Sequence, residues 1–447
     1  MAQSSNEPDG GQFHVEPGHD ASAPAAGDAA VSGSGAGALS HLKVLDLSRV
    51  LAGPWCTQML ADMGADVVKV ERPGEGDDTR HWGPPFMPDA DGKDTTQATY
   101  FNGTNRNKRS ITVDLSKPEG QALVRQMAQH SDILVENFKV GGLQAYGLDY
   151  TSLKALNPRL IYCSITGFGQ HGPYAERAGY DLMIQAMSGM MSITGRADDQ
   201  PGGGPLRVGV ALTDLFTGVY ATSAILAALE VRHRTGAGQL IDMALLDVGM
   251  AILANQASGY LNTGKVPQRQ GNSHPSLAPY QDFPTRDGAM LLAIGNDGQF
   301  ARFCKAAGMP EWSADPRFTG MGARVRNRDL LIPLMQTVTR TRDSADWIAL
   351  LEDKAVPCGP INDLAHAFAD PQVAARKLVV QQPCAPARAA ADGISAIRTV
   401  ASPLRLQDNP PVLLRPPPAL GEHTDEVLAE LGFDAQRIAA LRSSGIV

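Results

Sequence analysis

The sequence predicts an α/β fold built on a parallel sheet, and two observations lead to that prediction. Between residues 43 and 164, short apolar segments alternate with helical patterns at the spacing of strand–helix–strand units. The segment Leu160–Ser164 opens with three consecutive apolar residues, as expected of a parallel strand buried on both faces. Ligands of such sheets gather at the carboxyl ends of the strands. The loops that follow the strands are therefore where a functional site is expected.

The first unit begins with a strand at Lys43–Leu47 and a helix near Pro54, because proline suits the first turn of a helix. Gly64 ends this helix, and a second strand at Val67–Val70 completes a unit of Rossmann type. Further strands are expected at Ser110–Asp114, Ile133–Val135 and Leu160–Ser164, helices at Pro118–His130 and from about Asp214 to Arg234, and a strand and helix between Leu240 and Ala257.

After about residue 261, the apolar residues follow strand-like spacing in some segments and helix-like spacing in others, and prolines and glycines separate these segments. This pattern favours a smaller α+β domain. It is expected to hold a strand at Met290–Ala293 and helices at Gln299–Ala307, Asn327–Thr339 and Ser344–Asp353. The predicted parts are a disordered extension (1–40), a large Rossmann-like domain (41–260), the small domain (261–378), and a return connection with a final helix, Thr424–Leu431, that packs on the large domain (379–447).

Composition narrows the function classes. The 447 residues are 43% hydrophobic and 19% charged, which is typical of a soluble enzyme. The net charge is -8, and the acidic extension contributes -5 of it. The remaining chain is thus weakly acidic, which does not indicate nucleic acid as a partner. No signal peptide and no uninterrupted apolar run of about 18–20 residues is evident, which predicts a cytoplasmic protein with no membrane partner. The five cysteines lack metal-ligand spacing, so we expect reduced thiols and no metal site.

The turn after the first strand, Ser48–Gly53, excludes one ligand class. An acidic residue after the second strand, such as Glu71, often binds the ribose of a dinucleotide, but this turn lacks the G-x-G-x-x-G fingerprint. Arg72 beside it suggests a phosphate-bearing ligand, although an exposed arginine after a strand can simply be solvated. The basic stretch Asn105–Arg109 has the same two interpretations, a solvated loop or a clamp for anionic groups.

Asp214 also has two interpretations. It lies where the apolar run Val208–Leu212 enters a long helix, and an aspartate in the first helical turn can accept orphan backbone N–H groups. Alternatively, the small neighbours Gly209, Ala211 and Gly218 let a substrate approach a carboxylate that can attack an acyl carbon. These residues alone leave both roles open.

Several motifs in order along the chain resemble the class III CoA-transferase family, also called the carnitine dehydratase and bile-acid-inducible family. They are LKVLDLSRVLAGPWCTQMLADMGADVVKVERP, NRNKRSITVDLSKPEG, VENFKVGGL, LIYCSITGFGQHGPYAERAGYD, VALTDLFTG, CGPIND and LGEHTDEVL. The resemblance covers about Leu42 to Val447. It implies that Asp214 is a nucleophile, acylated by a donor CoA thioester to a mixed anhydride and converted to an aspartyl-CoA thioester. An ordinary carboxyl pKa of about 4 would keep it ionised at neutral pH.

The resemblance also implies that the 41–260 domain binds CoA, which is a substrate and not a permanently bound cofactor. The implied CoA contacts are Leu51, Ala52, Arg72, Val113, Asn137, Phe138, Lys139, Tyr180 and Asp181, with Arg72 at the phosphate or adenosine end. Two positions depart from the family pattern, because Ala145 replaces an arginine that contacts CoA in many relatives and Val140 replaces a proline. CoA affinity is then expected to depend more on Lys139, Arg106 or Lys108.

Tyr180 separates two activities within the superfamily. The α-methylacyl-CoA racemases resemble this chain but place a histidine there as one of two bases, and tyrosine, with a pKa of about 10, is a poor substitute. We therefore expect a transferase, with a racemase or epimerase as the alternative enzyme.

The nearest resemblance is to succinyl-CoA:glutarate-type members. The second carboxylate of such an acid favours a cationic partner, and the candidates are Arg106, Lys108, Arg324 and Arg328, each of which can also be a plain surface charge. The resemblance further implies an interlocked homodimer. A non-catalytic partner subunit of a hetero-oligomer is the third possibility, and the presence of Asp214 argues against it.

Overall fold

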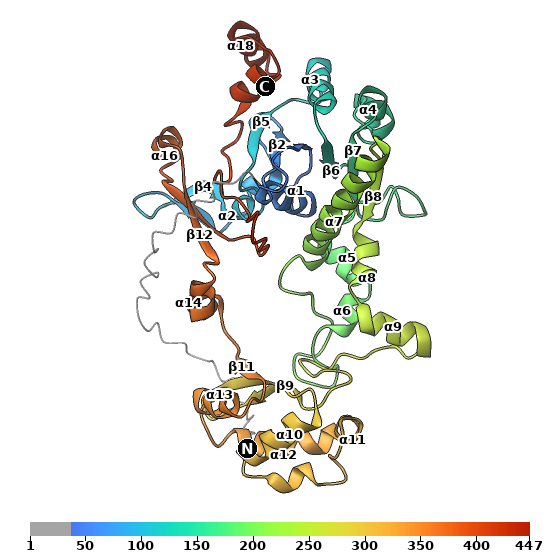
Figure 1. Cartoon of the computed structure of the whole chain (residues 1–447), viewed down its shortest axis with the longest axis vertical. Coiled ribbons are helices and arrows are strands. Elements are labelled where there is room, and N and C mark those ends of the chain that lie inside the picture. Colours follow the sequence, from blue (N-terminus) through green and yellow to red (C-terminus); the bar gives the residue numbers. More distant parts are fainter. Residues whose placement is uncertain (1–36) are drawn as a thin grey trace, which may run out of the picture. The chain divides into compact units, whose positions relative to one another are not determined.

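The computed structural model describes residues 37–447 (Figure 1). The extension predicted for 1–40 lies, up to residue 36, outside the described residues. A central six-stranded sheet, entirely parallel, confirms the predicted α/β class and runs in the order β5-β2-β1-β6-β7-β8. Its strands are β1 (Lys43–Asp46), β2 (Asp66–Glu71), β5 (Arg109–Thr112), β6 (Ile133–Glu136), β7 (Ile161–Thr166) and β8 (Leu240–Ala244).

The chain order of the strands reverses beside β1. From β1 the sheet grows through β2 to β5 on one side, and it then resumes at β6 on the other side and continues to β8. The loops after β1 and β6 therefore leave the sheet at a topological switch point, where open α/β sheets form their ligand crevice.

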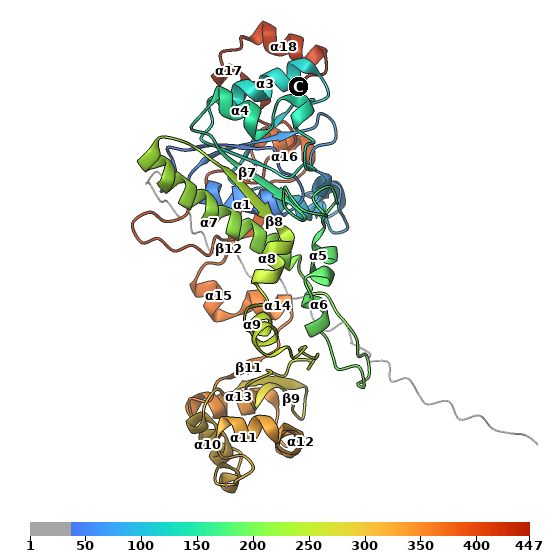
Figure 2. The ribbon, with the colours of Figure 1, turned by 90° about the vertical axis from the view of Figure 1, so that its right-hand side faces the viewer.

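Helices cover both faces of this sheet (Figure 2). One face carries α3 (Pro118–Gln129), α4 (Tyr150–Leu156), α17 (Thr424–Glu430) and α18 (Ala435–Ser443), and the other carries α1 (Ala52–Asp62), α5 (Asp181–Met187), α7 (Leu212–Thr235) and α8 (Leu245–Ala251). Successive strand residues supply the two cores alternately, because side chains along a strand point to opposite faces. Val44 packs in the α1 and α7 core, for example, and Leu45 in the α3 and α17 core.

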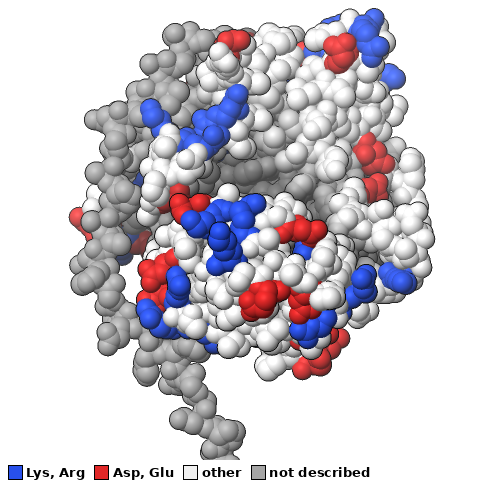
Figure 3. All heavy atoms as spheres, turned by 60° about the horizontal axis from the view of Figure 1, so that its bottom comes forward, with Lys and Arg blue, Asp and Glu red and all other residues white. Residues whose placement is uncertain are grey.

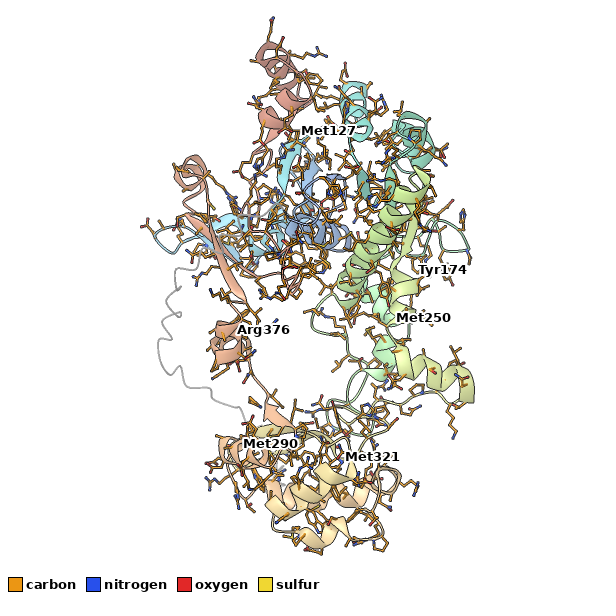
Figure 4. The ribbon with its side chains drawn as sticks, viewed as in Figure 1. Met127, Tyr174, Met250, Met290, Met321 and Arg376 are labelled. Atoms are coloured by element: carbon orange, nitrogen blue, oxygen red, sulfur yellow. The ribbon has the colours of Figure 1, made fainter. Side chains whose placement is uncertain are left out.

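A second, antiparallel sheet has the order β11-β10-β9 and its own core, which includes Met290 (Figure 4). Its strands are β9 (Tyr280–Pro284), β10 (Ala289–Ala293) and β11 (Cys358–Pro360), with helices α10 (Asp297–Ala306), α11 (Met321–Arg326), α12 (Arg328–Thr339) and α13 (Ser344–Asp353). Antiparallel strands beside helices agree with the α+β character predicted for this part of the chain.

Three segments hold more structure than predicted. The polar loop after β2 forms a hairpin of β3 (Phe86–Pro88) and β4 (Asp94–Ala98), followed by α2 (Thr99–Asn102). The expected return connection contains an antiparallel pair, β12 (Val379–Pro383) and β13 (Ala396–Val400), around α16 (Pro386–Asp392). The helix Thr424–Leu431 is not the last one, because α18 follows it. Further α-helices are α6 (Met190–Ile193), α9 (Ala254–Thr263), α14 (Leu364–Ala369) and α15 (Pro371–Ala375).

The helix α7 is long and apolar enough to cross a membrane by length and mean composition alone, although polar residues interrupt its apolar run. Core helices of soluble proteins meet the same criteria. Here Ala221, Ile225 and Leu229 of α7 pack in the core beneath the central sheet. One side of α7 therefore packs in this core, and large apolar side chains on its other side are exposed.

Candidate active site

The turn after β1 is fixed by side chains from the loops that follow the two neighbouring strands, β6 and β2. Asn137, which follows β6, accepts the Arg49 N–H at 2.9 Å and donates its amide to the Arg49 carbonyl at 2.7 Å. On the other side, the Asp77 carboxylate accepts the Val50 N–H at 3.2 Å. Val50 has φ 71°, a left-handed conformation that β-branched residues rarely adopt. Two neighbouring loops thus hold the chain where it enters α1.

Helix α1 and helix α7 approach closely near their starts. A Cβ added at Gly218 would lie 2.8 Å from the Ala52 carbonyl oxygen and 2.9 Å from Cδ1 of Trp55. Gly218 is therefore needed for helix packing and not for substrate access, which corrects the sequence interpretation. Asp214 lies one turn earlier on the same face of α7. The nucleophile candidate is in this way brought to the start of α1.

Side chains of α5 anchor the segment that leads to Asp214. Asp181 Oδ1 accepts the Thr213 N–H at 2.9 Å and its hydroxyl at 2.6 Å. Gln185 donates to Asp181 Oδ2 at 2.7 Å and accepts the Val208 N–H at 2.9 Å. Asp181 is thus the carboxylate that caps the start of α7. Within residues 37–447 the Asp214 carboxylate accepts no hydrogen bond, which leaves the capping interpretation of Asp214 without support.

Burial raises the pKa of Asp214 to about 7, and the negative charge of Asp181 acts in the same direction. The expected ordinary value of about 4 is therefore corrected. The cause is burial, and within residues 37–447 no cation or hydrogen-bond donor offsets it. A carboxylate that is poorly solvated and unpaired is a stronger nucleophile than one in water, and such perturbed groups concentrate at functional sites.

Sequence reasoning missed one aromatic residue of this region. Burial raises the pKa of Tyr100, and the negative charges of Asp214, Asp181 and Asp77 act in the same direction. The Tyr100 ring meets Trp82 edge-on, with ring centroids 5.5 Å apart. The tyrosine belongs to α2, in the loop after β2 that showed no periodic pattern, so no signal in the sequence pointed to it.

The predicted CoA contacts lie after strands of the central sheet, or at α1 and α5. Leu51 and Ala52 are buried at the start of α1, and Phe138 lies 5.5 Å from the Arg49 guanidinium. Lys139, Tyr180 and Arg72 are exposed, with the Tyr180 residue 66% and the Arg72 side chain 71% accessible. Arg72 donates to Glu75 at 2.9 Å. Val113 is buried and directly follows the edge strand β5, and Asp181 accepts the Thr213 N–H.

The four cations proposed for the substrate's second carboxylate already have protein partners. Buried Arg106 pairs with Asp62, and buried Lys108 pairs with Asp46 at 3.0 Å. Arg324 is buried beside Met321, labelled in Figure 4, and donates to Asp297 at 2.7 Å and to the Ala278 and Phe318 carbonyls. Arg328 donates to Gln270 Oε1 and to the His274 and Pro275 carbonyls. These contacts engage all four groups within the protein, and the burial of Arg106, Lys108 and Arg324 corrects the alternative of a plain surface charge for those three.

We also looked for a metal site, for paired cysteines and for a basic surface. No group of three or more His, Cys, Asp or Glu side chains suited to a metal ion occurs in the part of the chain that the structure describes. All five cysteines are free thiols. On the face drawn in Figure 3, basic side chains lie beside acidic ones, and that face is not a continuous basic surface.

Comparison with known proteins identifies related chains. The family model described as CoA-transferase family III matches residues 39–424. A succinate–glutarate CoA-transferase of Agrobacterium fabrum is 52% identical over 88% of this chain and 95% of its own length. A human succinyl-CoA:glutarate CoA-transferase is 42% identical over 92% of this chain and 90% of its own. The crystal structure of a CAIB/BAIF family protein from Brucella suis superposes with a TM-score of 0.78 at 49% identity, covering 89% of this chain and 100% of that one.

Proposed function

The chain belongs to CoA-transferase family III, and from that premise we propose that it transfers CoA from succinyl-CoA to a dicarboxylic acid through covalent intermediates on Asp214. The role of Asp214 is supported by its position at the start of α7 and beside the start of α1. There its carboxylate is half-buried, has a pKa of about 7 and has no partner among the described residues. The dicarboxylate class rests on the names of relatives that act on succinate and glutarate.

The reaction proceeds in four acyl-transfer steps. The Asp214 carboxylate attacks the donor thioester carbonyl, the C–S bond breaks, and CoA leaves as the thiolate, which produces a mixed anhydride. The thiolate then attacks the Asp214 carbonyl of this anhydride and releases the donor acid, leaving an Asp214–CoA thioester. The acceptor carboxylate attacks that thioester, which breaks its C–S bond, releases the CoA thiolate and forms a second mixed anhydride. The thiolate then attacks the acceptor carbonyl of this anhydride, which gives the acceptor-CoA thioester and regenerates the Asp214 carboxylate.

CoA binding at the switch point supports these steps. Contacts along the long CoA molecule can position its thioester, since binding energy from non-reacting groups is used to orient reacting ones. We assign the thioester end to Leu51 and Ala52, which lie beside the first turns of α7. Asn137 and Phe138 lie on the other side of the same turn.

We also propose that the protein works as an interlocked homodimer. Large apolar side chains on α7, α8 and α9 are exposed in the single chain, which is unusual for a surface without a partner. These exposed residues are Phe216, Val219, Tyr220, Leu226, Met250, Tyr260 and Leu261. A second copy packed on these helices would cover them.

The proposed reaction is tested by incubating the enzyme with succinyl-CoA and a panel of mono- and dicarboxylates, with mass detection of new thioesters. New thioesters of C4 to C6 dicarboxylates are expected, with free succinate formed in equal amount. Solvent deuterium at the α-carbon of an acyl-CoA, with no second acid required, would instead identify an epimerase.

The pH dependence of transfer should follow the carboxyl group of Asp214. Because only the ionised form attacks, kcat/KM for the acyl-CoA should fall about tenfold per pH unit below the pKa of about 7. Asp181→Asn removes a negative charge that raises this pKa, so the acidic limb should move to lower pH. Initial rates between pH 5.5 and 8.5 measure both effects, and identical profiles for parent and variant would contradict this assignment.

A further inference from the structure

The turn that precedes α1 is held by hydrogen bonds on four consecutive backbone groups. Lys69 Nζ donates to the Ser48 carbonyl at 2.7 Å, and Asn137 accepts the N–H of the same peptide group, at Arg49. The next peptide group is held in the same way, because Asn137 donates to the Arg49 carbonyl and Asp77 accepts the Val50 N–H. In each of these two successive peptide groups, both the C=O and the N–H are hydrogen-bonded, which fixes the orientation of the group.

The conformation at Val50 requires this support. Its φ of 71° is disfavoured for any residue with a Cβ and most of all for a β-branched one. Strained residues of this kind persist only where the surroundings determine the backbone, and they concentrate at functional sites. Leu51 and Ala52, the residues assigned to CoA, follow directly. The direction in which the chain enters α1 therefore depends on the angle at Val50.

The hydrogen bonds and the ion pair of Asp77 stabilise this conformation of Val50. Both of its carboxylate oxygens lie 3.2 Å from the Val50 nitrogen, and Oδ1 also accepts the Thr79 N–H and hydroxyl. Its counter-ion is Lys69, whose Nζ lies 2.9 Å from Asp77 Oδ2 in a pair with no solvent exposure on either side chain. Burial alone would raise the pKa of Asp77, but Lys69 and the Thr79 hydrogen bonds outweigh it and keep the carboxylate ionised.

We propose that Asp77, with Lys69 as its buried counter-ion, is a positioning residue for acyl-CoA, because it holds Val50 in the left-handed conformation that places Leu51 and Ala52. The inference rests on the proposed function, which assigns the CoA thioester end to those two residues. Asp77 acts through the backbone of Val50, and no contact between its side chain and the substrate is required.

Glycine at position 50 separates this role from general support of the fold. Glycine adopts a φ of about 70° without a steric penalty, so a protein with Val50→Gly needs the Asp77 acceptor less. If Asp77 acts through Val50, the second substitution should rescue the first. If Asp77 merely stabilises the protein, Val50→Gly should not rescue CoA binding.

The test measures the Kd of free CoA by titration calorimetry on the full-length protein for Asp77→Ala, Val50→Gly and the double variant. We expect Asp77→Ala to raise this Kd by about tenfold or more, and the double variant to return to within about threefold of Val50→Gly. The KM for the acceptor acid should be unchanged. A Kd that is unchanged in Asp77→Ala, or equally weak in the double variant, would overturn the proposal.

Asp62→Ala is the matched control, because it also removes a buried carboxylate from an ion pair, with Arg106, but at the far end of α1. It should lower the melting temperature without changing the Kd of CoA. If Asp77→Ala does not fold, the same comparison is made with Asp77→Asn: the Kd of CoA is measured for this variant with and without Val50→Gly. Failure of the proposed function is distinguishable, because direct CoA binding needs no turnover: a protein that binds CoA but transfers none leaves the positioning result valid.

Discussion

Asp214→Asn is expected to lower kcat for CoA transfer by about three orders of magnitude or more, because an amide cannot form the anhydride or the thioester. The same change removes a poorly solvated charge that no hydrogen bond compensates in the described residues. The melting temperature should therefore stay level or rise, and the Kd of free CoA should stay close to that of the parent. Initial rates with succinyl-CoA and an accepted acid, together with thermal unfolding, measure these effects.

Asp329→Asn is the matched control for this experiment. Asp329 also lies in the first turn of a helix, α12, and is exposed. Its conversion to asparagine should leave kcat within about twofold of the parent, as expected for a surface substitution. A rate for Asp214→Asn within tenfold of the parent would show that another group carries the acyl chain.

The largest effect on stability is expected at Asp46→Asn. The Asp46 carboxylate has no solvent exposure and accepts hydrogen bonds from Ser48, Thr57 and Lys108, while Lys69 adds a second positive charge nearby. Neutralising it leaves two buried lysines with too little negative charge, so the free energy of unfolding should fall by about 3–5 kcal/mol. Denaturant unfolding of the parent and the variant at pH 7 measures this difference.

The pH dependence of stability has a definite sign at this position. Burial alone would raise the pKa of Asp46, but Lys108 and Lys69 outweigh it and lower the value from 3.8 to about 2. The stabilisation is therefore complete above about pH 4 and is lost as the pH falls toward 2. Asp353→Asn, which breaks an exposed pair with Lys354, should change stability by less than about 1 kcal/mol. Equal losses for both variants would contradict the buried-charge account.

Much of the fold was predictable because it depends on local patterns. The strands near Val44, Val67 and Ile133 were found from consecutive apolar residues, since parallel strands are buried on both faces. The hairpin formed by β3 and β4 was missed because its sequence, from Phe86 to Ala98, is mostly polar and lacks a clear alternation of apolar residues. The resemblance to the CoA-transferase family is confirmed, and it rested on motif order rather than on any single motif.

The site was less predictable, because charge pairing between distant residues leaves no sequence signal. From the sequence, Arg106 and Lys108 belong to a basic stretch of a loop. In the structure both are buried, and they pair with Asp62 and Asp46, which lie more than forty residues earlier in the chain. The unusual φ of Val50 is equally invisible in its residue type. The raised pKa of Asp214 follows from its burial without a cationic partner among residues 37–447, which no local pattern encodes.

The most direct test of the central claim is to identify the acylated residue. Enzyme incubated with succinyl-CoA alone is treated with hydroxylamine and digested with trypsin. The peptide Val208–Arg232 contains only two carboxylate side chains, Asp214 and Glu230, and fragmentation distinguishes them. The account predicts a hydroxamate on Asp214 and none in the Asp214→Asn protein. A hydroxamate on any other residue, or turnover with no trapped adduct in the parent enzyme, would contradict it.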